Sequence, residues 1–155
     1  MAYGYSERMS EQLALIDQTL PTNAAAGSFN TSPGIDLSKG KRALYLISVG
    51  AVTATGTLDG RLQASVNSNF AGASNIANTN LTQITASNIQ AKLEIQADNM
   101  PVISGNLARY VRLNTTVGTT AVIYGAIGLL GQTMQSPASQ YESTAVVGQT
   151  VVLGS

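Results

Sequence analysis

The stretch Ile89–Asp98, IQAKLEIQAD, alternates apolar and polar residues more cleanly than any other part of the chain. Every second position from Ile89 to Ala97 is apolar, and Gln, Lys, Glu and Asp occupy the positions between and after them. A helix would place Leu93 and Ile95 on nearly opposite faces, whereas a strand places them on the same face. The stretch therefore predicts a β-strand with one buried and one solvated face, which is typical of antiparallel sheets.

Further strands are predicted on both sides of this stretch, at Ala43–Val52, Thr57–Val66, Ala108–Val117 and Thr120–Leu130, with a weaker one at Thr144–Leu153. Thr57–Val66 alternates in the same way, and Asn67–Asn80 is so rich in Asn and Ser that it predicts a long loop. Thr120–Leu130 consists of apolar and small residues, which predicts a strand that is buried on both faces. Roughly six to eight strands separated by turn residues predict an all-β fold, an antiparallel β-sandwich of jelly-roll-like topology.

The N-terminal region follows a different pattern. Four of its apolar residues are spaced to share one helical face: Met9, Leu13, Ile16 and Leu20. We therefore predict a short amphipathic helix over Glu7–Leu20, which Pro21 would end. The following small and polar residues up to Gly34 form either a first strand around Gly27–Thr31 or a continuation of an arm.

These patterns divide the chain into an N-terminal arm (residues 1–34), a sandwich core (35–130) and a C-terminal segment (131–155) that is a last strand or an interface tail. Tyrosine near the chain ends is suited to an interface, because it offers a large area together with a hydroxyl group. The candidate interface residues are Tyr3, Tyr5, Met9, Leu13, Ile16, Leu20, Tyr141, Val146 and Val147.

Histidine, cysteine and tryptophan are all absent from the sequence, and only 10% of the residues are charged. General acid–base catalysis usually relies on His or a tuned carboxylate, and zinc and iron sites rely on His and Cys. We therefore expect neither an enzyme nor a protein that holds a metal ion or another cofactor.

The charge balance and the apolar runs also bear on the partners. The eight basic and eight acidic residues cancel, which leaves no electrostatic attraction for nucleic acid. Lys39, Lys41 and Arg42 form the densest basic cluster, which we interpret as a solvated turn before a strand.

The longest apolar run, Ala121–Leu130, is ten residues long, whereas a membrane helix needs about 20. Because the first residues also lack the apolar part of a secretory signal, we expect a protein made in the cytoplasm that binds no membrane.

Arg109 and Arg112 flank Tyr110 within one of the predicted strands. We expect these arginines to pair with Asp59 or Glu94 across the sheet. The alternative is that they form a patch that faces a sugar or a protein partner.

Several short segments occur in an order that is similar to a known family: Ala43–Val49, GTLDGRLQAS at Gly56–Ser65, Leu81–Thr85, LEIQ at Leu93–Gln96 and ARYVRL at Ala108–Leu113. This order resembles the small decoration or cement proteins on the heads of tailed bacteriophages, over about Ala43 to Leu130. The resemblance implies a virion protein on the capsid exterior, made in the host cytoplasm, that binds the major capsid protein and stabilises the head. It also implies a homodimer or homotrimer, with the N-terminal segment lying along the capsid or a neighbour.

The segment Ala108–Leu113 also resembles a strand of discoidin-like carbohydrate-binding modules, which would make a surface glycan the partner. The chain contains only six Tyr and two Phe and no Trp, so aromatic platforms for sugar stacking are poorly supplied. The head protein is therefore the preferred hypothesis and the carbohydrate-binding module is the alternative.

Overall fold

The computed structural model describes residues 13–133 of the 155-residue chain. Its regular secondary structure is almost entirely strand, and one turn of 3-10 helix, η1 (Ala97–Asn99), follows β7. The strands are β1 (Leu13–Ala24), β2 (Phe29–Thr31), β3 (Ile35–Asp36), β4 (Gly40–Val52), β5 (Thr57–Ser65), β6 (Ser74–Asn75), β7 (Ile89–Gln96), β8 (Val102–Ile103), β9 (Asn106–Leu107), β10 (Tyr110–Gly118) and β11 (Val122–Thr133). All of their pairings are antiparallel, which confirms the expected all-β, antiparallel chain.

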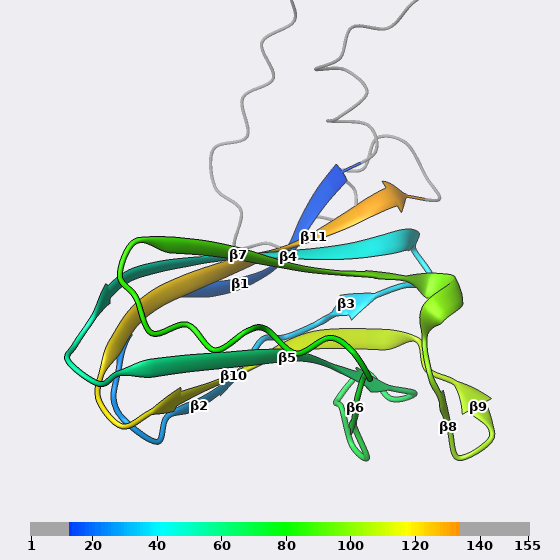
Figure 1. The fold of residues 1–155 in the computed structure, drawn as a ribbon. Coiled ribbons are helices and arrows are strands. Elements are labelled where there is room, and N and C mark those ends of the chain that lie inside the picture. The colour runs from blue at the N-terminus through cyan, green and yellow to red at the C-terminus, as the bar shows by residue number, and fades with distance from the viewer. Residues whose placement is uncertain (1–12, 134–155) are drawn as a thin grey trace, which may run out of the picture.

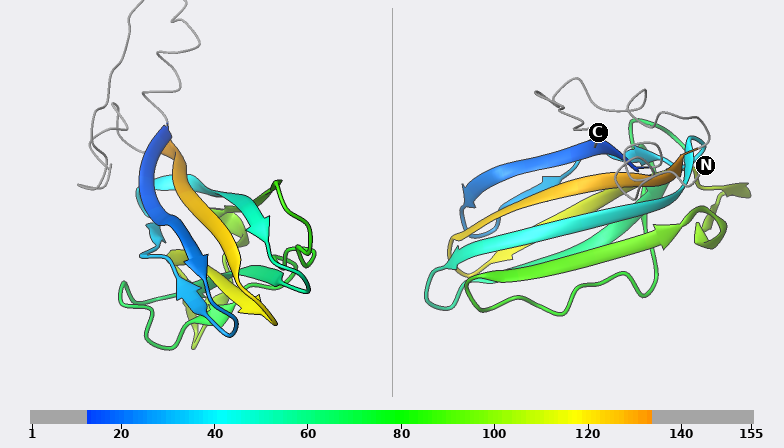
Figure 2. Two further views of the ribbon diagram at one scale, coloured as in Figure 1. Left: turned by 90° about the vertical axis from the view of Figure 1, so that its left-hand side faces the viewer. Right: turned by 90° about the horizontal axis from the view of Figure 1, so that it is seen from above.

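The strands form two main sheets, which lie one above the other in Figure 1. The first sheet has the order β1-β11-β4-β7, and these four strands run side by side in the view from above in Figure 2. The second sheet has the order β2-β10-β5-β6, with β3 also paired to β10, and β8 and β9 form a separate hairpin. Apart from the short strands β3, β6, β8 and β9, consecutive strands along the chain alternate between the sheets: β1, β4, β7 and β11 belong to the first sheet, whereas β2, β5 and β10 belong to the second.

A single hydrophobic core fills the space between the two sheets. Both sheets contribute alternate residues to it, because successive side chains of a strand point to opposite faces. Two hydrogen-bonding tyrosines of the first sheet reach across this core to β10 of the second. The Tyr45 hydroxyl donates to the backbone oxygen of Val111 at 3.1 Å, and the hydroxyls of Tyr124 and Thr115 lie 2.7 Å apart.

The predicted alternation is confirmed in β5 and β7. In β5, Leu58, Gly60, Leu62 and Ala64 are buried, while Thr57, Asp59, Arg61 and Gln63 are partly exposed. The alternation ends at Ser65, which is buried as well. In β7, Leu93 and Ile95 are buried and their polar neighbours are exposed, whereas Ile89 at the start of the strand is 37% exposed. Local sequence therefore determined both the strand and its inward face at these places.

The helix predicted for Glu7–Leu20 is wrong from Leu13 onward, because Leu13–Leu20 belongs to β1. β1 is an edge strand whose pairing with β11 has two register shifts, one between Leu15 and Asp17 and one between Thr19 and Thr22. Such irregularities break the period-two pattern, so the apolar residues fall by coincidence at helical spacing. Pro21 does not stop the strand, because an edge strand can accommodate a residue without a backbone N–H group.

The predicted boundary at residue 34 does not separate an arm from the sheets. β1 pairs with β11, and β2 pairs with β10, so both belong to the two main sheets. β2 (Phe29–Thr31) confirms the first-strand alternative for Gly27–Thr31, and β11 continues past residue 130 to Thr133.

The predicted loop Asn67–Asn80 contains the short strand β6, and the chain after it continues along β5 as far as Ile84. Backbone N–H groups of this segment donate to β5: Ile76 to Leu62 at 3.0 Å, Leu81 to Gly60 at 2.8 Å and Ile84 to Leu58 at 3.0 Å. We call residues 76–84 the edge segment, because it extends the second sheet without forming a regular strand.

Candidate interaction surfaces

The outer side of the first sheet carries apolar residues on three of its four strands. We call this surface the apolar face, formed by Leu15, Leu44, Leu46, Ile123, Ile127 and Leu129. The register places Leu15, Leu129 and Leu44 in one cross-strand row and pairs Ile127 with Leu46 in the next. Cross-strand neighbours of this kind have their side chains in contact range, so these five residues form a continuous surface. Ile123 lies further along β11, on the other side of the row that pairs Gly125 with Ser48.

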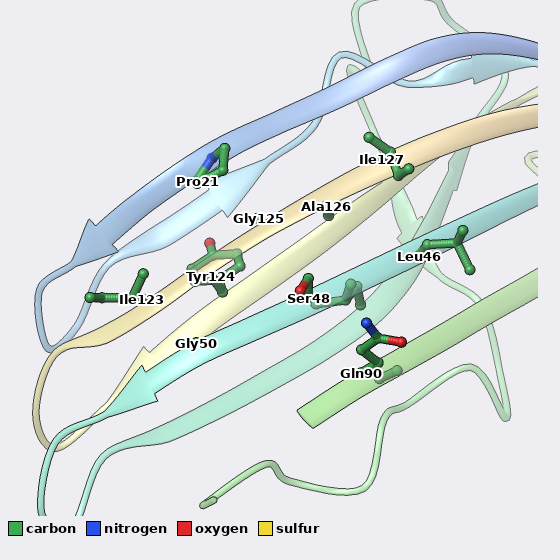
Figure 3. A pocket seen from close by; sticks show the side chains of 12 residues that line it. Pro21, Leu46, Ser48, Gly50, Gln90, Ile123, Tyr124, Gly125, Ala126 and Ile127 are labelled. Atoms are coloured by element: carbon green, nitrogen blue, oxygen red, sulfur yellow. The ribbon is translucent and has the colours of Figure 1, made fainter. Parts of the chain in front are cut away.

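A groove of about 600 Å³ lies in the apolar face (Figure 3). Its floor contains Gly50, Gly125 and Ser48, which carry no side chain or a small one. Pro21 of β1 lies directly beside Gly125, where an added Cβ would come within 3.2 Å of it. The groove therefore exists because small residues stand at outward positions of β4 and β11 between larger apolar neighbours.

A polar strip on β7 borders the apolar face. Gln90, Lys92, Glu94 and Gln96 are all exposed. The Glu94 carboxylate forms a salt bridge of 2.7 Å with Arg42 of the neighbouring β4. Apolar residues bordered by polar ones are typical of protein interfaces, which have a dry centre and a wet rim.

The prediction that Thr120–Leu130 is buried on both faces is wrong for this chain. Val122, Tyr124 and Ala126 face the core and are buried, but Ile123 and Ile127 are 42% and 39% exposed. Leu46, opposite Ile127, is 37% exposed. The sequence thus supplies apolar residues to both sides of β11, while the two sheets cover only one side. Apolar residues on both sides of this strand are therefore the sequence signal of the apolar face.

The outer side of the second sheet is polar. We call this surface the polar face, formed by Asp59, Arg61 and Gln63 of β5 with Arg112 and Thr116 of β10. Arg112 donates to Gln63 at 3.0 Å and its guanidinium lies 4.6 Å from the centre of the Phe70 ring.

Arg109 and Arg112 do not have the partners that the sequence analysis expected. Arg109 donates two hydrogen bonds of 2.6 Å to Asp36 of β3, and its guanidinium lies 5.1 Å from the centre of the Tyr110 ring. Glu94 instead pairs with Arg42, and Asp59 accepts hydrogen bonds from Gln83. The expected pairing with Asp59 or Glu94 is therefore wrong for both arginines. Arg109 has an ion pair with Asp36 because β3 lies beside β10 in the second sheet, which the sequence did not indicate.

The ion pair shifts the pKa of both groups. Partial burial of Asp36 raises the pKa of its carboxyl, but hydrogen bonds from Arg109 and Ser38 outweigh this and hold it below its ordinary value of 3.8. The hydrogen bonds to Asp36 raise the pKa of Arg109, which therefore stays charged.

Three of the predicted interface residues, Leu13, Ile16 and Leu20, belong to β1 at the edge of the first sheet. Ile16 packs partly buried against the core. The other six predicted residues lie outside the described part of the chain: Tyr3, Tyr5, Met9, Tyr141, Val146 and Val147.

Within residues 13–133, no three or more Asp and Glu side chains gather into a group that could hold a metal ion. No helix in this part of the chain is long and apolar enough to cross a membrane. No protein-family model matches the sequence, and no curated protein matches it either.

Proposed function

We propose that the chain is a non-enzymatic virion structural protein that binds the outer surface of a capsid and stabilises the head, with the apolar face as its contact surface. The exposed outer side of β11 carries this proposal. A strand that is apolar on both faces is typical of strands covered on both sides, and here one side is left open. A partner that covers Ile123, Ile127 and Leu46 would complete the burial.

A jelly-roll-like β-sandwich is the arrangement that we propose for the two sheets. Its support is the way the chain crosses repeatedly between the sheets, so that each sheet contains strands that are distant in sequence. Jelly rolls are common in viral capsid and lectin domains. The similarity of the strand segments to phage decoration proteins points to the first of these two groups.

The mechanism would be the burial of additional area at the joints between subunits of the major capsid protein. A single small contact is weak, but binding as a homodimer or homotrimer at many equivalent positions multiplies it. The balanced charge of the chain favours this, because it limits repulsion between closely packed copies.

The test is cosedimentation of the purified full-length protein with empty shells of its own virus. We expect saturable binding, competition by unlabelled protein, and a higher temperature of shell disruption when the sites are filled. The absence of any binding to these shells would contradict the proposal.

A deletion of residues 1–12 tests whether the N-terminal residues contribute to the same contact. This deletion keeps every strand within residues 13–133, whereas a deletion of residues 1–34 would remove β1 and β2. We expect weaker binding from the shortened chain, and unchanged binding would assign the contact to the apolar face alone.

A further inference from the structure

A polar pocket of about 400 Å³ lies on the polar face, on the opposite side of the molecule from the groove. Three neighbouring parts of the second sheet form it. Asp59 and Arg61 come from β5, Asn114 and Thr116 come from β10, and Asn80 comes from the edge segment. The register pairs Asn114 with Arg61 and Thr116 with Asp59, so these four side chains lie on the same face.

Asn114 is the unusual residue of this pocket. The neighbouring outward residues of β10, Arg112 and Thr116, are partly exposed, whereas Asn114 is only 1% exposed. Neither its Nδ2 nor its Oδ1 atom has a hydrogen-bond partner in residues 13–133. Buried amide groups nearly always have partners, so an unpaired amide beneath a pocket suggests that the partner comes from a ligand.

The two charged side chains of the pocket, Asp59 and Arg61, could each form hydrogen bonds with a ligand. Gln83 donates to both carboxylate oxygens of Asp59, at 3.2 and 3.1 Å, and so fixes this acceptor in place. The guanidinium of Arg61 has neither an ion pair nor a hydrogen bond within the described residues, so its donors are available. One carboxylate and one guanidinium make the pocket neutral overall, which disfavours both anions and cations.

The available groups suit one class of ligand. Asp59 accepts hydrogen bonds, Arg61 donates them, and the amides of Asn80 and Asn114 do both. Neighbouring hydroxyl groups of a sugar both donate and accept, and a neutral sugar carries no charge for the pocket to balance. Anionic phosphates and carboxylates would meet Asp59 at close range.

We propose that this pocket binds a single residue of a neutral glycan, with Arg61 and Asn114 as its main hydrogen-bonding groups. The proposal is independent of capsid binding, because the pocket and the apolar face belong to different sheets. A decoration protein with both features would hold the shell with one side and a glycan with the other.

The test is a titration of the full-length protein with methyl glycosides of glucose, galactose, mannose and N-acetylglucosamine, followed by NMR of the side-chain amides and by calorimetry. We expect saturable binding of at least one glycoside with a Kd of about 1 mM, as befits a ligand of this size. The Asn114 side-chain amide resonances should shift on binding, because the amide gains a partner.

Two variants and one control locate the site. Asn114→Leu and Arg61→Gln should each weaken binding at least about tenfold, as expected for the loss of a hydrogen bond to a charged or buried group. Lys92→Gln removes one positive charge from the first sheet instead and should leave the affinity unchanged. Because Asn114→Leu replaces an unpaired amide by an apolar group of similar size, it should raise the melting temperature while it removes binding.

Two results would overturn the proposal. One is the absence of saturable binding by every glycoside of the panel, which would leave Asn114 as an unpaired amide without a ligand. The other is binding that persists unchanged in both Asn114→Leu and Arg61→Gln, which would place the glycan elsewhere on the molecule.

Discussion

The outward positions of the first sheet carry Leu46, Ile123 and Ile127, whereas the corresponding positions of the second sheet carry Asp59, Arg61 and Arg112. Both surfaces cover the same core with strands of similar length, so the core does not require this difference. Each exposed Å² of apolar surface costs about 25 cal/mol relative to a buried one. The outer side of the first sheet, with its exposed apolar side chains, is therefore suited to contact with a partner. The outer side of the second sheet, with its polar side chains, is suited to contact with water.

The largest expected effect comes from making the apolar face polar. The double substitution Leu46→Thr and Ile127→Thr should weaken shell binding by about 100-fold, or about 2.7 kcal/mol. Threonine preserves the preference for a strand, so the free energy of unfolding should change by less than about 1 kcal/mol. Cosedimentation and thermal unfolding measure the two quantities.

The matched control for this variant is Lys92→Thr on the polar strip, opposite Leu46 in the register. It places the same new side chain at the rim and should leave binding nearly unchanged. Equal losses in the control and in the double variant would show that the apolar residues are not the contact.

A smaller effect is expected from the two glycines in the groove floor. Gly125→Ala should lower the free energy of unfolding by about 1 kcal/mol, because its Cβ would lie 3.2 Å from Pro21 and β1 would have to shift. Gly50→Ala should be neutral or slightly stabilising, because its nearest new contact is an ordinary 3.5 Å to Ile123. Urea unfolding of both variants checks the difference, and an equal loss in both would contradict this account of the floor.

The tyrosines that cross the core test how the two faces are held together. Tyr45→Phe and Tyr124→Phe should each lower the free energy of unfolding by about 1 kcal/mol, because each removes a buried hydrogen bond between the sheets. Tyr110→Phe, on the polar face, should change it by less than about 0.5 kcal/mol. Shell binding should remain as in the unmodified protein, since none of these hydroxyls lies on the apolar face.

The smallest effect is expected from pH. The pKa of Asp36 is lower in the folded protein than its ordinary value of 3.8, so its ion pair with Arg109 contributes to stability above about pH 4. This contribution is lost as the pH falls from about 4 through the folded-state pKa. Thermal unfolding between pH 6 and pH 3, values that bracket an ordinary Asp pKa of about 4, should show a smaller decrease in Asp36→Asn than in the unmodified chain. Identical pH profiles would mean that other carboxylates control the acid response.

Much of the fold could be predicted because the signal is local. The alternation in Thr57–Val66 and Ile89–Asp98 identifies two strands and their inward faces, since the strand period is built into the spacing of residues. β1 could not be predicted in this way. Its register shifts disrupt the alternation, and the strand is held by residues of β11 that lie 98 to 118 positions further along the chain.

The candidate surfaces were predictable only in part. The apolar residues on both sides of Thr120–Leu130 were visible in the sequence, but they indicated burial on both faces rather than an open surface. The pocket around Asn114 gave no signal, because Asn is common throughout the chain and its neighbours Arg61 and Asn80 come from separate segments.

The sequence by itself determined an all-β chain with alternating strands, a balanced charge and no His or Cys, because composition and periodicity are properties of neighbouring residues. The tertiary structure decided which strands pair. Within residues 13–133, it therefore decided which side of β11 is left uncovered and which amide of β10 is left without a partner. Both outcomes depend on contacts between distant segments, and the order of strands in the sheets is what brings those segments together.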